Sequence, residues 1–355
     1  MVQSVLVRIL LAPFALLYGL GVSLNSLFYR MGVLKSLSFN VPVISVGNLS
    51  VGGAGKTPHI EYLVRNFREY LDIATLSRGY KRKTQGFQLV HPGLDAEAVG
   101  DEPLQFKRKF PDVLVAVAED RSLAIPRIMM ERPSTQLILL DDAFQHRSVK
   151  PGLNILLTEY AHPFTRDWLL PSGRLREWRS AYQRADVIIV SKCPPDLSAE
   201  AAEKLRAEIN PLPHQQLFFT CYDYLRPYYI FDSRYQLNFT PDLEVLLISA
   251  IARTDYLMDY LQEQVAAVRP LEYEDHHYFS NYDIADMQRS FERMDAKSKV
   301  ILTTEKDATR LELHRAYLQQ NRLPVFVLPV EVRFLFDGKE AFDALVKQFL
   351  VDFTV

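Results

Sequence analysis

The stretch VGNLSVGGAGKTPHIEYLV, residues 46–64, sets the architecture of this 355-residue chain. An apolar run with β-branched residues, 41–49, leads into it and is typical of a buried strand. Beyond Lys56 the apolar residues recur at helical spacing, with Pro58 in the first turn, where proline is tolerated. The order strand, glycine-rich turn, Lys-Thr and helix predicts a phosphate-binding loop made of Ser50, Val51, Gly52, Gly53, Ala54, Gly55, Lys56 and Thr57.

The chemistry of this loop predicts a ligand. Its glycines expose backbone N–H groups that can surround phosphate oxygens, and the following helix directs its positive end toward them. Lys56 offers a charge for the β- and γ-phosphates, and Thr57 offers a hydroxyl ligand for Mg²⁺. Ser50 stands where the usual P-loop has its first glycine, and the alternative interpretation is a glycine turn without a ligand. We expect a Mg²⁺–nucleoside triphosphate.

A second element is the strand-like run LILLDDAFQH, residues 137–146. In a P-loop fold the strand beside the loop carries an acidic residue at its C-terminal end, where it holds Mg²⁺ directly or through water. Asp141 and Asp142 are the candidates for this metal site. Taken alone, such a pair is also compatible with a turn or a helix cap.

The pattern along the chain predicts an α/β fold with two domains. Short, wholly apolar runs recur between helical segments, which is typical of a parallel sheet with helices on both faces, as in P-loop NTPases. We expect this P-loop domain to cover residues 36–222. A connector rich in tyrosine and phenylalanine (223–240) then leads to a second, smaller α/β domain (241–355).

The N-terminus differs in character, because residues 9–29 are uncharged and mostly apolar between Arg8 and Arg30. As a helix this segment is roughly 31 Å long, close to the ~30 Å hydrocarbon core of a bilayer. Residues 1–35 are therefore predicted to be a membrane-anchoring helix. The helix could span the bilayer, lie in its interface, or be a buried core helix or cleaved signal.

Composition excludes some classes of protein. Hydrophobic residues make up 48% and charged residues 24%, as in globular chains. Lys plus Arg number 41 and Asp plus Glu number 43, for a net charge of −2, so bulk positive charge does not favour nucleic-acid binding. Cys193 and Cys221 have neither metal-ligand spacing nor a disulfide pattern, which indicates a reducing compartment.

Four further stretches carry chemistry. Asp101, in GDEP, is a candidate base for a reacting hydroxyl, or merely a helix cap. LLPSGRLREW (169–178) places Arg176 and Glu177 after a turn, where they could meet an anionic ligand. EDHHYFS (274–280) sets two histidines beside acidic residues. These side chains could form a catalytic pair, bind a metal or have no function. The basic loop SRGYKRK (77–83) could contact anionic headgroups.

In chain order these motifs resemble the tetraacyldisaccharide 4'-kinases of the lipid A pathway. The resemblance covers nearly the whole chain, from the apolar N-terminus to TTEKDATR (303–310), and its most specific parts are DDAFQH and LLPSGRLRE. The family's usual DDGxQH has Ala143 in place of glycine here.

The resemblance implies a bacterial inner-membrane enzyme whose active site faces the cytoplasm. Such an enzyme transfers the γ-phosphate of ATP to the 4'-hydroxyl of a tetraacyldisaccharide 1-phosphate, forming lipid IVA. Its partners are then the lipid disaccharide 1-phosphate and the bilayer, with no nucleic acid, and its cofactors ATP and Mg²⁺.

The resemblance also implies residue roles. Lys56 and Thr57 bind phosphate and Mg²⁺, and Asp141 and Asp142 hold the metal. Asp101 acts as base, assisted by His276, which is preferred over His277 because it directly follows Asp275. Arg176 and Glu177 are active-site loop residues. Because Asp101 and His276 fall in different predicted domains, we expect domain closure to complete the site.

The alternative function is a membrane-associated P-loop ATPase that switches partners on hydrolysis. Such a switch does not need the acidic and histidine groups outside the nucleotide site. A GTPase is disfavoured because VIIVSKCPPDL (187–197) lacks an Asn-Lys-x-Asp motif.

Overall fold

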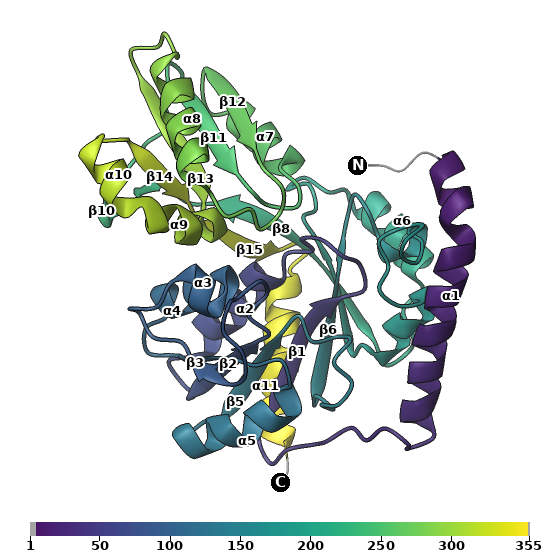
Figure 1. The fold of residues 1–355 in the computed structure, drawn as a ribbon. Coiled ribbons are helices and arrows are strands. Elements are labelled where there is room, and N and C mark those ends of the chain that lie inside the picture. The colour runs from purple at the N-terminus through teal and green to yellow at the C-terminus, as the bar shows by residue number, and fades with distance from the viewer. Residues whose placement is uncertain (1–4, 354–355) are drawn as a thin grey trace.

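The computed structural model describes residues 5–353 and contains two sheets, each at the centre of one lobe (Figure 1). The large lobe is built on a nine-stranded sheet. Its strands, in spatial order, are β15 (Val330–Phe334), β8 (Gln216–Tyr224), β7 (Val187–Ser191), β6 (Leu153–Glu159), β1 (Val43–Asn48), β5 (Leu137–Asp141), β2 (Ile73–Ser77), β4 (Leu114–Val117) and β3 (Gln88–Leu89). All neighbours are parallel except the outermost pairs, β15 with β8 and β3 with β4.

Helices cover both faces of this sheet. On β1, Ile44 and Val46 pack into the core under α2 and α11, whereas Val43 points to the opposite core, under α5. This alternation explains why the strands are apolar on both sides. The helical segments of the large lobe after the N-terminal helix are α2 (Lys56–Phe67), α3 (Ala96–Val99), α4 (Asp101–Lys109), α5 (Arg121–Glu131), η1 (Phe164–Arg166), η2 (Arg179–Arg184), α6 (Ala199–Ile209) and α11 (Gly338–Asp352).

The small lobe is built on a six-stranded sheet. Its strand order is β10 (Asp232–Gln236), β9 (Tyr228–Tyr229), β14 (Val325–Leu328), β13 (Lys299–Thr304), β11 (Glu244–Ser249) and β12 (Ala267–Glu272). Its helical segments are α7 (Asp255–Gln262), α8 (Asn281–Glu292), α9 (Glu305–Leu311), η3 (Glu312–His314) and α10 (Arg315–Gln320). Leucines of α7 line one core of this lobe, and α8 to α10 line the other. The predicted α/β class is therefore confirmed for both lobes.

The chain crosses between the lobes twice, so the lobes differ from the predicted boundaries. β15 pairs with β8 in antiparallel register, and Phe342 and Val346 of α11 enter the core of the large lobe. The segment 330–353 therefore lies with the large lobe rather than in the expected 241–355 domain. The expected connector, 223–240, contributes β9 and β10 to the small lobe's sheet. Residues 1–4 and 354–355 of the predicted end segments lie outside the described part.

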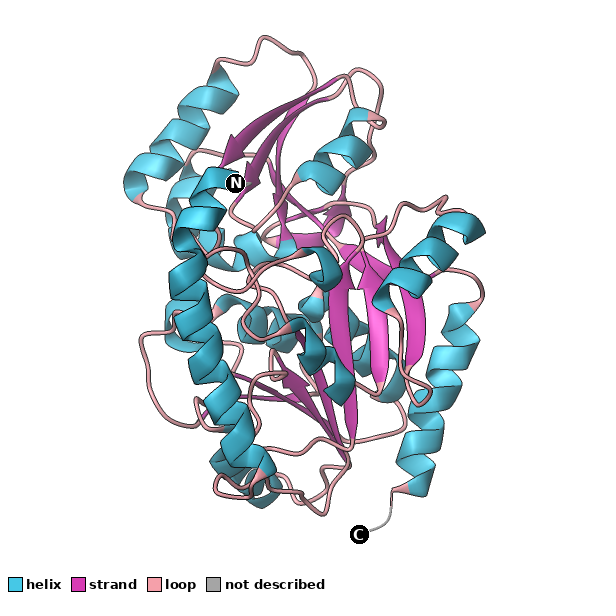
Figure 2. Ribbon diagram, turned by 90° about the vertical axis from the view of Figure 1, so that its right-hand side faces the viewer, coloured by secondary structure: helices cyan, strands magenta, loops and turns pink. Residues whose placement is uncertain are grey.

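The N-terminal apolar segment forms helix α1 (Val5–Arg30), which runs along the outside of the large lobe (Figures 1 and 2). Residues Leu6–Arg30 are long and apolar enough to cross a membrane, with a mean hydropathy of 1.8, and only 11% of the window is buried. A buried core helix, one of the alternatives, does not fit this exposure. Ala15 packs into the core shared with β6 and β7, whereas Leu10 and Leu17 on another face are 74% and 67% exposed.

Candidate active site

The phosphate-binding loop lies between β1 and α2, as expected from its sequence. Gly55 has φ 84°, and a Cβ there would lie 2.3 Å from the Tyr222 hydroxyl oxygen, so only glycine fits without strain. Lys56 begins α2, and its Nζ lies 3.3 Å from Asn48 Oδ1 and 3.8 Å from Asp142 Oδ1. The loop therefore presents its lysine and the N-terminus of a 12-residue helix at the carboxyl edge of the sheet.

His59, on the first turn of α2, was not singled out from the sequence. Its Nδ1 lies 2.7 Å from the carbonyl oxygen of Gly55, and its Nε2 lies 3.1 Å from Thr220 Oγ1. Burial lowers the pKa of His59 to about 4. The imidazole is therefore neutral at pH 7, with Nδ1–H donating to the Gly55 carbonyl oxygen and the Thr220 hydroxyl donating to Nε2. A buried side chain thus fixes the end of the phosphate loop.

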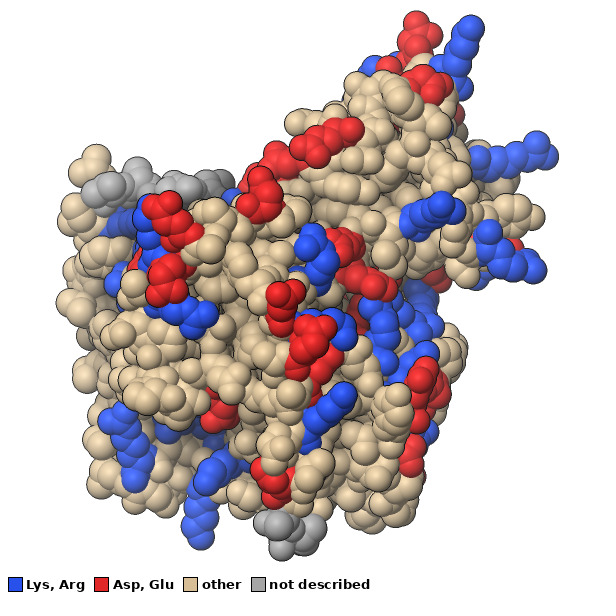
Figure 3. All heavy atoms as spheres, turned by 180° about the vertical axis from the view of Figure 1, so that it is seen from behind, with Lys and Arg blue, Asp and Glu red and all other residues tan. Residues whose placement is uncertain are grey.

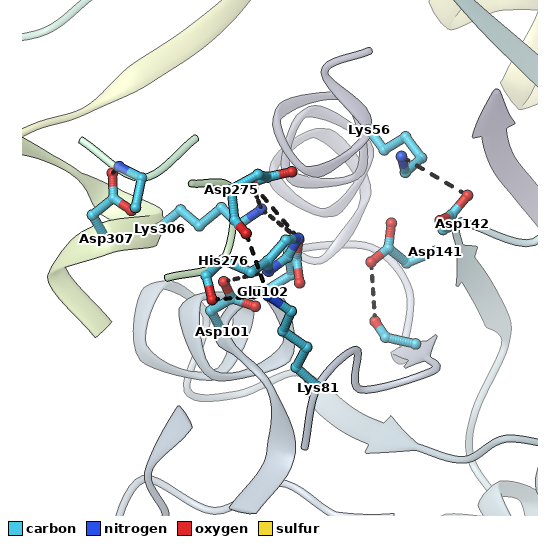
Figure 4. Close-up of polar contacts among 12 residues, drawn as sticks. Lys56, Lys81, Asp101, Glu102, Asp141, Asp142, Asp275, His276, Lys306 and Asp307 are labelled. Carbon is cyan, nitrogen blue, oxygen red and sulfur yellow. Dashed lines mark hydrogen bonds and ion pairs between the residues drawn. The ribbon is translucent and has the colours of Figure 1, made fainter. Parts of the chain in front are cut away.

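Asp141 is the last residue of β5, which pairs with β1, and Asp142 follows it, so both lie opposite Lys56 (Figure 4). Ser77 Oγ donates to Asp141 Oδ2 at 3.2 Å, whereas the buried Oδ1 has no hydrogen-bond partner among residues 5–353. Burial, with the nearby Glu102 carboxyl, raises the pKa of Asp141 to about 7. Burial opposes ionisation of Asp142 too, but Lys56 and Arg176 hold its pKa below the usual range. An orphaned carboxylate oxygen beside a second carboxylate suits a hard divalent cation.

Arg176 completes this side of the site. Its Nη2 donates to Asn48 Oδ1 at 2.6 Å and to Asp142 Oδ1 at 2.8 Å. Glu177, predicted beside it, points elsewhere: it pairs with Arg184 at 2.8 Å and is not among the residues that line the cavity. The structure therefore brings Arg176, but not Glu177, to the phosphate loop.

The second group of site residues joins the two lobes. His276 of the small lobe places Nδ1 3.0 Å from Asp101 Oδ2, on the first turn of α4 (Figure 4). His276 lines the cavity, and Asp101, which is 2% exposed, lies behind it. His277 pairs instead with Asp283 of its own lobe at 3.0 Å and does not line the cavity. The geometry thus distinguishes two adjacent histidines that sequence alone left open.

Lys306, at the start of α9, is a residue that the sequence analysis did not assign. Its Nζ lies 3.0 Å from His276 Nε2 and 3.1 Å from Glu102 Oε1. Burial opposes ionisation of Asp101, but the hydrogen bond with His276 and the charge of Lys306 hold its pKa below the usual range. Asp101, Glu102 and His276 are close enough together to hold a metal ion, but the Lys306 ammonium already supplies a cation there. In the sequence, Lys306 belongs to TTEKDATR (303–310), a motif that contributed to the resemblance but was given no role.

Two of the predicted site residues have unusual backbones, as does Lys192 on the cavity wall (φ 55°). Asp142 and His276 have φ values of 45° and 59°, in the left-handed region that non-glycine residues seldom adopt. Such conformations cost of order 1–3 kcal/mol each and concentrate at functional sites. Both residues are candidates that the sequence had selected.

The basic loop expected to meet headgroups contacts the small lobe. Lys81 Nζ donates to the carbonyl oxygens of Asp275 and His276 at 3.4 and 3.3 Å. The Tyr80 ring lies edge-on to the His276 ring, with 4.8 Å between the ring centroids. Arg78 of the same loop lines the cavity. This loop therefore helps to hold His276 over the site.

One cavity of about 660 Å³ unites both groups. Lys56, Thr57, Asp141, Asp142 and Arg176 line it from the large lobe, and His276 and Lys306 line it from the small lobe. This volume is in the range of small-molecule sites. The structure thus brings the predicted nucleotide residues and His276 to one cavity, with Asp101 behind His276. Domain closure stays a prediction.

Comparisons with known proteins identify the family of this chain. A family model described as Tetraacyldisaccharide-1-P 4'-kinase matches residues 7–350. A tetraacyldisaccharide 4'-kinase from Bacteroides fragilis (strain YCH46) is 41% identical over 348 residues, covering 96% of this chain and 93% of the relative. One from Flavobacterium psychrophilum is 44% identical over 332 residues, covering 93% of each. A crystal structure of "apo" form LpxK from Aquifex aeolicus in complex with ATP is 28% identical, with a TM-score of 0.73 over 97% of this chain and 99% of that one.

Proposed function

This chain belongs to the tetraacyldisaccharide-1-P 4'-kinase family, and on that basis we propose that Asp101 and His276 carry the proton transfer of an ATP-dependent lipid kinase. The enzyme moves the γ-phosphate of ATP to the 4'-hydroxyl of a tetraacyldisaccharide 1-phosphate, forming lipid IVA. The observation that supports these roles is the hydrogen-bonded Asp101–His276 pair facing Lys56 and Asp142 across one cavity.

Residues of the large lobe bind the nucleotide in this proposal. The backbone of residues 50–57 surrounds the phosphates, and Lys56 and Arg176 neutralise the charge of the transferring group. Thr57, Asp141 and Asp142 hold the Mg²⁺, a role that fits the partnerless Oδ1 of Asp141. The bound Mg²⁺ supplies charge neutralisation at the phosphates. In-line transfer then needs only an acceptor oxygen held against the γ-phosphate.

The acceptor's proton leaves on the small-lobe side. Because His276 is on the cavity wall, the 4'-hydroxyl meets its Nε2 first, and the Asp101 carboxylate behind it stabilises the imidazolium that forms. The low pKa of Asp101 keeps it ionised for this role, which refines the expectation that Asp101 itself is the base. When the hydroxyl binds at Nε2, Lys306 loses its contact with that atom. It keeps its ion pairs with Glu102 and Asp275, at 3.1 and 3.4 Å.

The location of the enzyme belongs to the same proposal. The acceptor is a lipid, and α1 exposes the leucines and phenylalanine of one face, among them Leu10, Phe14 and Leu17. Contacts with the large lobe extend from the Arg8 carbonyl to the Ser26 hydroxyl, so α1 lies against protein along most of its length. This arrangement favours a helix embedded in the surface of the inner membrane over one that crosses it alone, with the site on the cytoplasmic side, where ATP is available.

The test uses purified protein in detergent with γ-labelled ATP, Mg²⁺ and the disaccharide 1-phosphate. We expect label in the lipid fraction. In Lys56→Ala the rate of lipid labelling should fall by at least about 100-fold, because the variant lacks the ammonium charge that stabilises the transferring phosphate. Label released only as free phosphate would support an ATPase switch. Lipid labelling that survives Lys56→Ala would contradict the proposed phosphate site.

A further inference from the structure

The segment between Trp168 and Trp178, here called the bridge loop, contacts α1 on one side. The Tyr18 hydroxyl donates to the backbone carbonyl oxygen of Arg176 at 2.9 Å. Trp178 Nε1 donates to the carbonyl oxygen of Gly19 at 3.1 Å and to Ser23 Oγ at 3.0 Å. These polar contacts of α1 are therefore directed at the bridge loop next to Arg176.

The packing of α1 against the bridge loop depends on Gly19. A Cβ on Gly19 would lie 2.4 Å from Trp178 Cζ2 and 2.9 Å from Leu169 Cδ1, closer than carbon atoms can pack. At Gly21, on the exposed side of the same helix, an added Cβ would have no atom of another described segment within 4 Å. The helix therefore requires glycine at position 19, whereas position 21 has room for a side chain.

The other side of the bridge loop contacts the phosphate loop. Arg176 N–H donates to the Leu49 carbonyl oxygen at 2.7 Å, and Val51 N–H donates to the Arg174 carbonyl oxygen at 2.8 Å. These two bonds form a short antiparallel bridge between Ser50 and Leu175. The backbone of Arg176 is therefore bonded to α1 through its carbonyl and to the phosphate loop through its N–H.

The side chain of Arg176 extends this connection to the candidate metal site. Its guanidinium bonds both Asn48 and Asp142, and Asn48 Oδ1 also accepts from Lys56 Nζ at 3.3 Å. A displacement of the bridge loop would therefore move Arg176, which is hydrogen-bonded to Asp142. It would also disturb Asn48, which contacts Lys56. Membrane attachment alone requires none of these contacts, because an apolar outer face is sufficient for it.

We propose that α1 is a positioning element of the nucleotide site as well as a membrane anchor. Its seating on the bridge loop sets the position of Arg176 and of residues 49–51, and hence the affinity for Mg·ATP. The inference rests on the proposed function, in which Arg176 and residues 50–57 bind the nucleotide. Tyr18, Gly19 and Trp178 are positioning residues, since none of them is required to touch the substrate.

The first test compares Gly19→Leu with its matched control Gly21→Leu, which adds the same apolar side chain on the open side. Binding of Mg·ATP to the full-length protein is measured in detergent by calorimetry, without lipid acceptor. We expect Gly19→Leu to raise Kd about tenfold, or about 1.4 kcal/mol, and Gly21→Leu to leave it unchanged. Equal Kd values in two folded variants would overturn the proposal.

Tyr18→Phe serves if Gly19→Leu does not fold, because it removes one hydroxyl and keeps the ring. We expect a several-fold rise in Kd for Mg·ATP with unchanged Tm and unchanged partition into vesicles of phosphatidylglycerol and phosphatidylethanolamine. In a double-mutant cycle with Arg176→Ala, the effect of Tyr18→Phe should be smaller than in the wild type, because the part carried by the guanidinium is lost while the backbone bonds to residues 49–51 remain. Full additivity, or an unchanged Kd, contradicts the inference. Lipid labelling by the wild type tests the kinase function separately, since these assays measure nucleotide binding alone.

Discussion

At the scale of single residues, the site depends on side chains whose neighbours belong to other segments. His276 hydrogen-bonds Asp101, 175 residues away in the chain, and His59 hydrogen-bonds Thr220, 161 residues away. In both cases a ring nitrogen has a partner that the sequence does not place beside it. The adjacent His277 illustrates the opposite case, since its partner, Asp283, is six residues away and belongs to the capping box of α8.

This difference predicts opposite outcomes for the two adjacent histidines. His276→Ala should lower kcat for lipid phosphorylation by about 10²–10⁴-fold, because the hydroxyl proton loses its acceptor. His277→Ala should leave kcat within a few-fold, since its side chain is off the cavity. Initial rates of lipid phosphorylation with labelled ATP, compared between the two variants and the wild type, test this prediction. Undiminished lipid phosphorylation by His276→Ala would remove this residue from the mechanism.

His59 predicts a pH dependence of stability. Its pKa falls from 6.5 to about 4 on folding, so between these values the unfolded chain binds a proton that the folded protein does not. The His59 contribution is complete above pH 6.5 and decreases as the pH falls toward 4, by about 1.4 kcal/mol per pH unit. His59→Gln should therefore show a shallower loss of unfolding free energy in urea over this window. The exposed His91→Gln is the control, and a slope equal to wild type in His59→Gln contradicts the assignment.

At the scale of elements, α1 has two faces with different surroundings. The face with Ala15 and Gly19 packs on the large lobe, and the face with Leu10, Leu17 and Leu20 is open, with exposures of 74%, 67% and 58%. The rear view in Figure 3 shows acidic and basic side chains interspersed over the face seen there, so that face offers no broad basic surface to anionic lipid. The proposed membrane contact of α1 therefore rests on its open apolar face.

Replacing Leu10, Leu17 and Leu20 together by serine should detach the protein from vesicles. Each leucine that enters the bilayer contributes about 1.5–3 kcal/mol, so the loss of three exceeds most interfacial affinities. Mg·ATP binding should be unchanged, because these side chains face away from the bridge loop. Flotation with liposomes measures the first effect. Leu313→Ser, a similar change on the small lobe, is the control, and retained flotation of the triple variant would contradict the role of this face.

At the scale of the whole molecule, charged pairs hold the lobes together around the cavity. Lys109 of α4 bonds Glu305 of α9 at 2.8 Å and Glu61 of α2 at 2.7 Å. Arg108 pairs with Glu312 at 3.0 Å on the same boundary. Both Glu61 and Glu305 are nearly buried, so removal of the lysine would leave two carboxyl groups without the cation that they share.

Lys109→Met is therefore expected to open the lobes. We predict a larger radius of gyration by small-angle X-ray scattering in detergent-matched buffer, and a lower kcat because His276 leaves Asp101. Lys107→Met is the matched control, two residues earlier on α4, since its Nζ bonds carbonyl oxygens of Pro111 and Val113 within its own lobe. An unchanged radius in Lys109→Met would show that other contacts, such as Lys306 with Glu102, are sufficient for closure.

Local sequence was sufficient to specify the phosphate loop, the Asp141–Asp142 strand end and the apolar strands, because each depends on a short run of residues whose backbone preferences and burial are local. The three-dimensional fold was needed to show that β15 and α11 return to the large lobe, that Glu177 pairs with Arg184, and that Lys306 lies against His276. The physical reason is that strand pairing and the partners of buried charges are chosen by whole surfaces brought together from distant segments.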